Sequence, residues 1–136
     1  MALLIAAGGA APLVIASMLT PAAQGMGTHT SMGLPACGFA TMANIPCPTC
    51  GMTTAFTWAA RGDMLSSFIA QPLGMVLALA AAMTVVAGLW ASVTGAAIQR
   101  PLGAVFLRPL VGWSLLLLLL VAWGWKIWAW QAGVTP

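Results

Sequence analysis

The residues in this chain that could carry chemistry are three cysteines and one histidine, and all four lie in one stretch of the sequence. They follow the pattern His-x7-Cys-x9-Cys-x2-Cys and are His29, Cys37, Cys47 and Cys50. Thiolates two residues apart can reach the same tetrahedral ion, and three cysteines with one histidine form a permitted zinc set. The pattern therefore predicts a metal site, with zinc or iron as the candidate ion.

The sequence around the last two cysteines, Cys47-Pro48-Thr49-Cys50-Gly51, is typical of a zinc knuckle. Proline stiffens the turn between the two thiols, and glycine permits the positive φ that follows it. The Cys-x2-Cys pair is the specific half of the predicted site. The other two ligands complete a set of four without a diagnostic spacing of their own.

Two other interpretations of the cysteines stay open at this point. Cys47 and Cys50 can close a disulfide, and a helix that begins near Gly51 would lower the pKa of one of them. Cys37 would then be a resolving thiol or take part in an intermolecular bond. Alternatively, all three cysteines simply pack, since cysteine is among the most buried residue types.

The composition shows what kind of protein must position these residues. The chain has 136 residues, of which 62% are hydrophobic and 4% are charged, whereas soluble domains carry about 25% charged residues. Such a chain cannot form a soluble surface and is predicted to be an integral membrane protein with the lipid bilayer as its main partner. Its four basic residues are scattered, so no nucleic-acid partner is expected: Arg61, Arg100, Arg108 and Lys126.

Three segments reach the length of about 20 apolar residues that crosses a bilayer. They are Ala2 to Thr20, Pro72 to Val93 and Pro109 to Trp130. A cleaved signal peptide is the alternative for the first segment, but no basic residue precedes its apolar run. We therefore predict an all-α integral membrane protein, a single membrane domain over residues 1–136 with three transmembrane helices.

The cysteines lie in the segment between the first and second predicted spans, residues 21–71. Within it, Gly51 to Ala60 and Asp63 to Ala70 are short, amphipathic and nearly uncharged. Such pieces are predicted to form helices that lie at the membrane interface or dip into it. The sequence thus predicts a cysteine-containing loop that leads into two short interfacial helices.

Charge and tryptophan placement predict the orientation of these segments. Arg100 and Arg108 lie between the second and third spans, and short basic loops stay in the cytoplasm. The cysteine loop is therefore predicted to be extracytoplasmic. Tryptophans gather at both ends of the spans as an aromatic belt, and Lys126 among them is predicted to extend to the headgroups.

The segment from His29 to Gly74 resembles a bacterial membrane family known as domain of unknown function 2752. The family pattern is a cysteine, about nine residues, and then Cys-Pro-x-Cys-Gly-x-Thr-Arg. Thr54 stands where the family has arginine, and Gln71 stands where it has asparagine before Pro-Leu. The matching positions are Cys37, Cys47, Pro48, Cys50, Gly51 and Thr53. The resemblance implies a bacterial inner-membrane protein whose cysteines act as a unit, and it implies no activity.

Two functional hypotheses follow. In the first, the protein is an accessory or structural subunit of a larger membrane assembly, and a metal or a disulfide clamps its Cys/His loop. In the second, it is a membrane thiol–disulfide redox or metal-handling protein that acts through Cys47 and Cys50. The first is favoured because the chain has no nucleotide-binding loop and little acid–base equipment beyond His29 and Asp63. No catalytic residue is therefore assigned.

Overall fold

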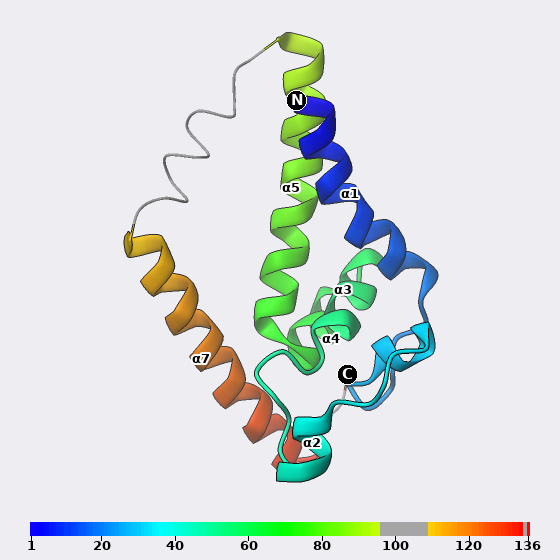
Figure 1. The fold of residues 1–136 in the computed structure, drawn as a ribbon, viewed down its shortest axis with the longest axis vertical. Helices are drawn as coiled ribbons and strands as arrows, with labels where there is room; N and C mark the ends of the chain where they lie inside the picture. Colours follow the sequence, from blue (N-terminus) through cyan, green and yellow to red (C-terminus); the bar gives the residue numbers. More distant parts are fainter. Residues whose placement is uncertain (96–108, 135) are drawn as a thin grey trace.

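The computed structural model describes residues 1–95, 109–134 and 136, and the regular elements in these ranges are all helices (Figure 1). The predicted all-α class is therefore confirmed for the described residues. The loop residues Arg100 and Arg108, on which the predicted orientation rests, lie outside them. The elements are α1 (Ala2–Met18), a 3₁₀ helix η1 (Thr28–Met32), α2 (Gly38–Ala43), α3 (Met52–Ala60), α4 (Met64–Ala70), α5 (Pro72–Thr94) and α7 (Pro109–Gln131).

Two of the three predicted spans are long and apolar enough to cross a bilayer. Helices α5 and α7 have 23 residues each, which corresponds to about 35 Å at 1.5 Å per residue. Helix α1 has 17 residues and reaches only about 26 Å, less than the hydrocarbon thickness of about 30 Å. It ends before the predicted Thr20 because Pro21 disfavours a helical conformation in the residue before it. The structure thus gives two candidate spans instead of three.

Helix α1 runs antiparallel to α5 and packs closely along the C-terminal half of α5 (Figure 1). Small residues make this approach possible, as they do in many contacts between apolar helices. A Cβ atom added to Gly88 in α5 would lie 2.9 Å from the backbone nitrogen of Ala6 in α1. The α1–α5 pair is therefore held by backbone proximity instead of by large interlocking side chains.

Helices α3 and α4 form a hairpin that packs against α5 and the C-terminal end of α1. Their bounds agree with the predicted short helices to within one residue. Asp63 caps the N-terminus of α4, and its carboxylate accepts a hydrogen bond of 2.9 Å from the backbone N–H of Ser66. The Ser67 hydroxyl, fully buried, donates to the carbonyl of Ala55 at 2.8 Å. The hairpin is thus a packed layer, and it is the element that supports the cysteine loop.

Helix α7 diverges from α5 and approaches the rest of the molecule near its C-terminal end (Figure 1). There the ring of Trp125 packs against Phe68 of α4, with 5.3 Å between the ring centroids. Farther from this contact the helix exposes a series of large apolar side chains: Leu110, Trp113, Leu115, Leu116, Leu117, Leu120 and Val121. Its C-terminal end lies next to the cysteine loop, and this brings the last helix to the candidate site.

The contact between α3 and α5 gives a prediction about stability. A Cβ atom on Gly74 would lie 2.7 Å from the Cβ of Ala55, so Gly74→Ala is expected to cost about 1–3 kcal/mol by overpacking. Gly112 in α7 has no atom within 4 Å of that position. Gly112→Ala is expected to be neutral or to stabilise by up to about 1 kcal/mol, since alanine favours helices. Thermal unfolding of both variants in detergent checks this, and equal effects would contradict the packing.

Candidate metal centre

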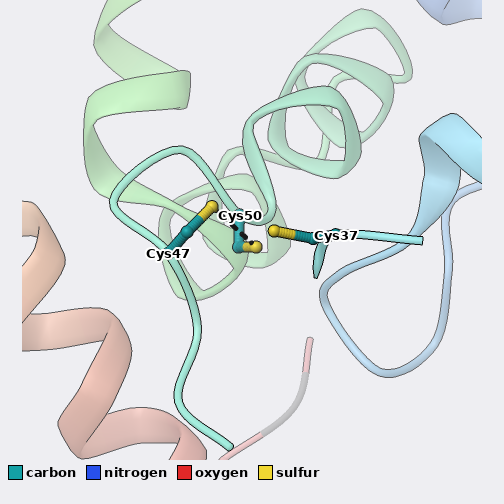
Figure 2. A group of neighbouring side chains, drawn as sticks. All are labelled: Cys37, Cys47 and Cys50. Carbon is teal, nitrogen blue, oxygen red and sulfur yellow. Dashed lines mark hydrogen bonds between the residues drawn. The ribbon is translucent and has the colours of Figure 1, made fainter. Parts of the chain in front are cut away.

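The three cysteines converge in one cluster, as the predicted metal site requires. Their Sγ atoms all lie within 4.8 Å of one another, and in Figure 2 the three side chains point toward one another. With Zn–S bonds of about 2.3 Å, the sulfurs of a tetrahedral site lie about 3.8 Å apart. The cluster therefore needs only small adjustments to enclose an ion. All three cysteines are free, so the predicted disulfide is not formed.

Successive tight turns bring Cys47 and Cys50 to the same side of the chain. The backbone N–H of Cys50 donates to the carbonyl of Cys47 at 3.0 Å, and that of Met52 donates to Thr49 at 3.1 Å. Gly51 follows with φ of +90° and leads directly into α3, a conformation that side chains with a Cβ atom rarely adopt. The segment Cys47–Gly51 is called the knuckle below. Its local sequence explains its shape.

Cys37 reaches the cluster from a different element. It lies immediately before α2, in an extended conformation with φ of −63° and ψ of 112°. Helix α2 then carries the chain away and returns it to the knuckle through Pro46, whose side chain is fully buried. The cluster therefore joins two segments that nine intervening residues separate, which is the arrangement that a metal clamp requires.

Three side chains from outside the knuckle lie against it or against the residue before it. The indole N–H of Trp123 donates to the carbonyl of Pro46 at 2.9 Å, and the amide of Gln71 donates to Pro48 at 2.8 Å. The ammonium of Lys126 lies beside Gly51, where an added Cβ atom would be 3.2 Å from Nζ. Helix α7 and the α4–α5 junction therefore fix the position of the knuckle.

These supporting residues were not predicted from the sequence. Lys126 was expected to extend to the headgroups, but only 5% of it is exposed. Its Nζ donates to the carbonyls of Gly25 at 3.0 Å and Ala70 at 2.7 Å. The prediction is wrong because these acceptors belong to segments distant in sequence that fold over the end of α7. The one feature of the sequence that could have indicated a buried role is that Lys126 is the single charged residue of its helix.

A cavity of about 390 Å³ opens over the cysteines, and His29 lines it together with them. The imidazole is outside the group of ligand atoms that lie within 4.8 Å of one another. Its 3₁₀ helix is tied to α3 by a hydrogen bond of 2.8 Å between the hydroxyls of Thr28 and Thr54, both buried. The structure thus brings together three of the four predicted ligands and places the fourth in the wall of the same cavity.

The two knuckle thiols differ in acidity. Burial by itself would raise the pKa of Cys47, but hydrogen bonds with Cys50, Thr49 and Cys37 outweigh it and lower this pKa to about 7. Burial raises the pKa of Cys50 to about 12, and its hydrogen bond with Cys47 acts in the same direction. Hydrogen bonds that favour the charged form of one group commonly disfavour it in the partner. Cys47 is therefore the thiolate of the metal-free pair.

This difference predicts selective alkylation of the metal-free protein. At a pH between the two pKa values, Cys47 is a thiolate and Cys50 is a thiol, and only thiolates react with iodoacetamide. Cys47 should therefore be modified much faster than Cys50, and its rate should fall as the pH drops below about 7 and the sulfur is protonated. Peptide mapping by mass spectrometry over a pH series measures this. Equal rates for the two cysteines would contradict the assignment.

The comparison with known families addresses the resemblance seen in the sequence. Residues 37–85 match the family model of a protein of unknown function, DUF2752. The match supports the predicted family over these residues. The DUF2752 segment begins at the first cysteine, contains α2, α3 and α4, and ends within α5. No curated protein and no solved structure matches the chain.

The matched segment contains the cysteines but only one of the side chains that hold the knuckle in place. All three cysteines and Gln71 lie within it, whereas His29, Trp123 and Lys126 lie outside it. Gln71 is fully buried and donates to the carbonyl of Pro48 in the knuckle. The DUF2752 knuckle is thus completed by contacts from a helix that the family match does not reach.

Proposed function

We propose that this protein is a small membrane protein in which one zinc or iron ion clamps the cysteine loop. Cys37, Cys47 and Cys50 are the ligands in this proposal, and the observation that carries it is their mutual Sγ separation of at most 4.8 Å. His29 is the fourth ligand because it is the only histidine in the sequence and lines the same cavity. The ion would join the loop before α2 to the turn before α3, and so order a segment with few other constraints.

Cobalt titration of the metal-free full chain in detergent tests this proposal. Thiolate ligands give Co²⁺ an intense charge-transfer absorption, so we expect this band to rise and saturate at one ion per chain. His29→Ala is expected to keep the charge-transfer band and to change the weaker ligand-field bands, because only a nitrogen ligand is lost. A chain that develops no charge-transfer band would contradict the proposed site.

The proposal includes a location in the membrane. Helices α5 and α7 are long enough to span a bilayer, and we propose that α1 enters it alongside α5. The cysteine loop lies at the end of the molecule where α5 begins and α7 ends (Figure 1). In the proposed orientation this end faces the extracytoplasmic side of a bacterial inner membrane, with Arg100 and Arg108 in the cytoplasm. Topology reporters inserted beside Arg100 test this, and a reporter active outside the cytoplasm would contradict it.

We further propose that the protein is an accessory subunit of a larger membrane assembly. The support is α7, because only 11% of its most apolar stretch is buried inside the structure. Such an uncovered apolar surface suits contact with lipid or with the helices of other subunits. Native mass analysis after extraction in a mild detergent tests this proposal. A particle that contains one copy of this chain alone would contradict it.

Thiol–disulfide exchange is the second candidate function, and the different acidities of Cys47 and Cys50 favour it. The Cys47 thiolate would attack a substrate disulfide, form a mixed disulfide and release the first substrate thiolate. Cys50, once deprotonated, would then attack the sulfur of Cys47 and release the second. The substrate is reduced to two thiols and the pair is oxidised to a disulfide. Equilibration with glutathione redox buffers tests this, and thiols that stay reduced throughout would contradict it.

A further inference from the structure

Lys126 is a buried cation with no acidic side chain available to it. Only 5% of the residue is exposed, and its ammonium donates hydrogen bonds to the carbonyls of Gly25 and Ala70. The chain contains a single acidic residue, Asp63, whose carboxylate accepts hydrogen bonds from Ser66 at the start of α4. Burying a charge is costly unless it is compensated. Two carbonyl dipoles offset part of this cost and carry no negative charge.

The cysteine cluster lies close to this cation and can become anionic. The ammonium of Lys126 lies beside Gly51, where an added Cβ atom would be 3.2 Å from Nζ. Gly51 is bonded to Cys50, which is itself buried. The ammonium therefore lies beside the residue that directly follows one thiol of the cluster. An ammonium has three N–H donors. The hydrogen bonds to Gly25 and Ala70 use two of them and leave one for the cysteine cluster.

The charge of the proposed centre matches that of the lysine. Three thiolates around a divalent ion leave one net negative charge when the fourth ligand is a neutral imidazole. In a buried site this charge needs a compensating cation. One lysine beside the knuckle supplies one positive charge, so the cluster and Lys126 together are neutral.

We propose that Lys126 is the positioning residue that balances the negative charge of the metal–thiolate centre. This inference rests on the proposed metal site and assigns to α7 an electrostatic role in it. The lysine offsets the net negative charge of the centre and, through the carbonyls of Gly25 and Ala70, holds the segments on both sides of the knuckle. In this proposal the loop supplies the ligands of the metal, and α7 supplies the positive charge that balances them.

A purely structural role for Lys126 makes a different prediction, and Trp123 provides the matched control. Trp123 also lies in α7 and also donates to a carbonyl of the loop, that of Pro46, but it carries no charge. Trp123→Phe removes this hydrogen bond and keeps the ammonium. Lys126→Gln removes the ammonium and keeps a donor. If Lys126 only tethers the loop, the two variants should affect metal binding equally.

The experiment measures cobalt affinity and thermal unfolding of the full chain in detergent. Lys126→Gln is expected to weaken cobalt binding by ~10-fold or more, the lower range of what a nearby opposite charge does to an ionisation equilibrium. Lys126→Arg should restore most of the affinity because it restores the charge. Trp123→Phe should lower the unfolding temperature and leave the affinity nearly unchanged. Lys126→Gln with parental affinity, or equal losses in Lys126→Gln and Trp123→Phe, would overturn the proposal.

Two further outcomes distinguish a failure of this proposal from a failure of the proposed metal site. If the parent chain binds no cobalt, the metal site fails, and Lys126 is tested by iodoacetamide alkylation of the metal-free thiols at one fixed pH. Slower alkylation in Lys126→Gln then supports the charge interaction, and an unchanged rate refutes it. If Lys126→Gln does not fold, Lys126→Arg decides: affinity close to that of the parent supports the proposal, and loss of cobalt binding in a folded Arg variant overturns it.

Discussion

Serine in place of Cys50 is expected to weaken metal binding severely and to lower the yield of folded protein. Cys50 is the buried member of the cluster, and a serine hydroxyl does not ionise to replace a thiolate ligand. Because binding of a structural zinc ion can contribute on the order of 10 kcal/mol to folding, losing one ligand of this site should be severe. We expect cobalt affinity to fall by at least about 100-fold, above the usual range for outer contacts of a metal site.

The neighbouring residues provide the controls for this substitution. Cys37→Ser is expected to have the same effect, because the structure places Cys37 in the cluster in spite of its distance in sequence. Thr49→Ala is expected to keep metal binding, since the hydroxyl contacts the sulfur of Cys47 at 3.4 Å and is not a ligand in the proposed site. If the serine variants bind cobalt and unfold like the parent, the cysteines only pack.

Alanine in place of Gly51 is expected to have the second large effect. Gly51 has φ of +90°, and an added Cβ atom would lie 2.7 Å from the carbonyl oxygens of both Gly25 and Ala70. The left-handed conformation costs a residue with a Cβ atom about 1–2 kcal/mol. The clash with two fixed carbonyls adds an overpacking cost of about 1–3 kcal/mol. We therefore expect a loss of several kcal/mol in unfolding free energy, together with weaker cobalt binding.

Gly33 separates the two contributions. It has φ of +78°, close to that of Gly51, and no atom lies within 4 Å of its Cβ position. Gly33→Ala should therefore show the conformational cost alone, with cobalt binding intact. Denaturant unfolding of both variants in the same detergent gives the comparison. Equal losses at the two glycines would mean that the contact of Gly51 with Gly25 and Ala70 does not contribute to stability.

The helices of this chain were largely predictable from the sequence. Proline marks the first residue of both α5 and α7, and each ends one residue beyond its predicted limit. The hairpin helices were found because Gly51 and Asp63 are recognisable start signals. Helix α1 was predicted two residues too long because apolar residues continue to Leu19, whereas the restriction imposed by Pro21 acts on the residue before it. The short elements η1 and α2 were not predicted, since they are too short for a hydrophobic period.

The candidate site was predictable only in its local part. The knuckle follows from the order of cysteine, proline and glycine, whereas Cys37 was included only because it completes a set of ligands. The contacts of Trp123 with Pro46 and of Lys126 with Gly25 join residues 77 and 101 positions apart. No local pattern encodes such contacts. A cation near the end of an apolar helix looks the same in sequence whether it reaches solvent or caps buried carbonyls.

The most direct test of the metal centre is the metal content of the full chain, purified without added metal or chelator and kept under inert gas. Elemental analysis and a thiol count are made on the same sample. The proposed site predicts one zinc or iron ion per chain and three thiols that react fully only after the metal is removed. A chain that contains no metal and has three freely reactive thiols, or a disulfide, would contradict it.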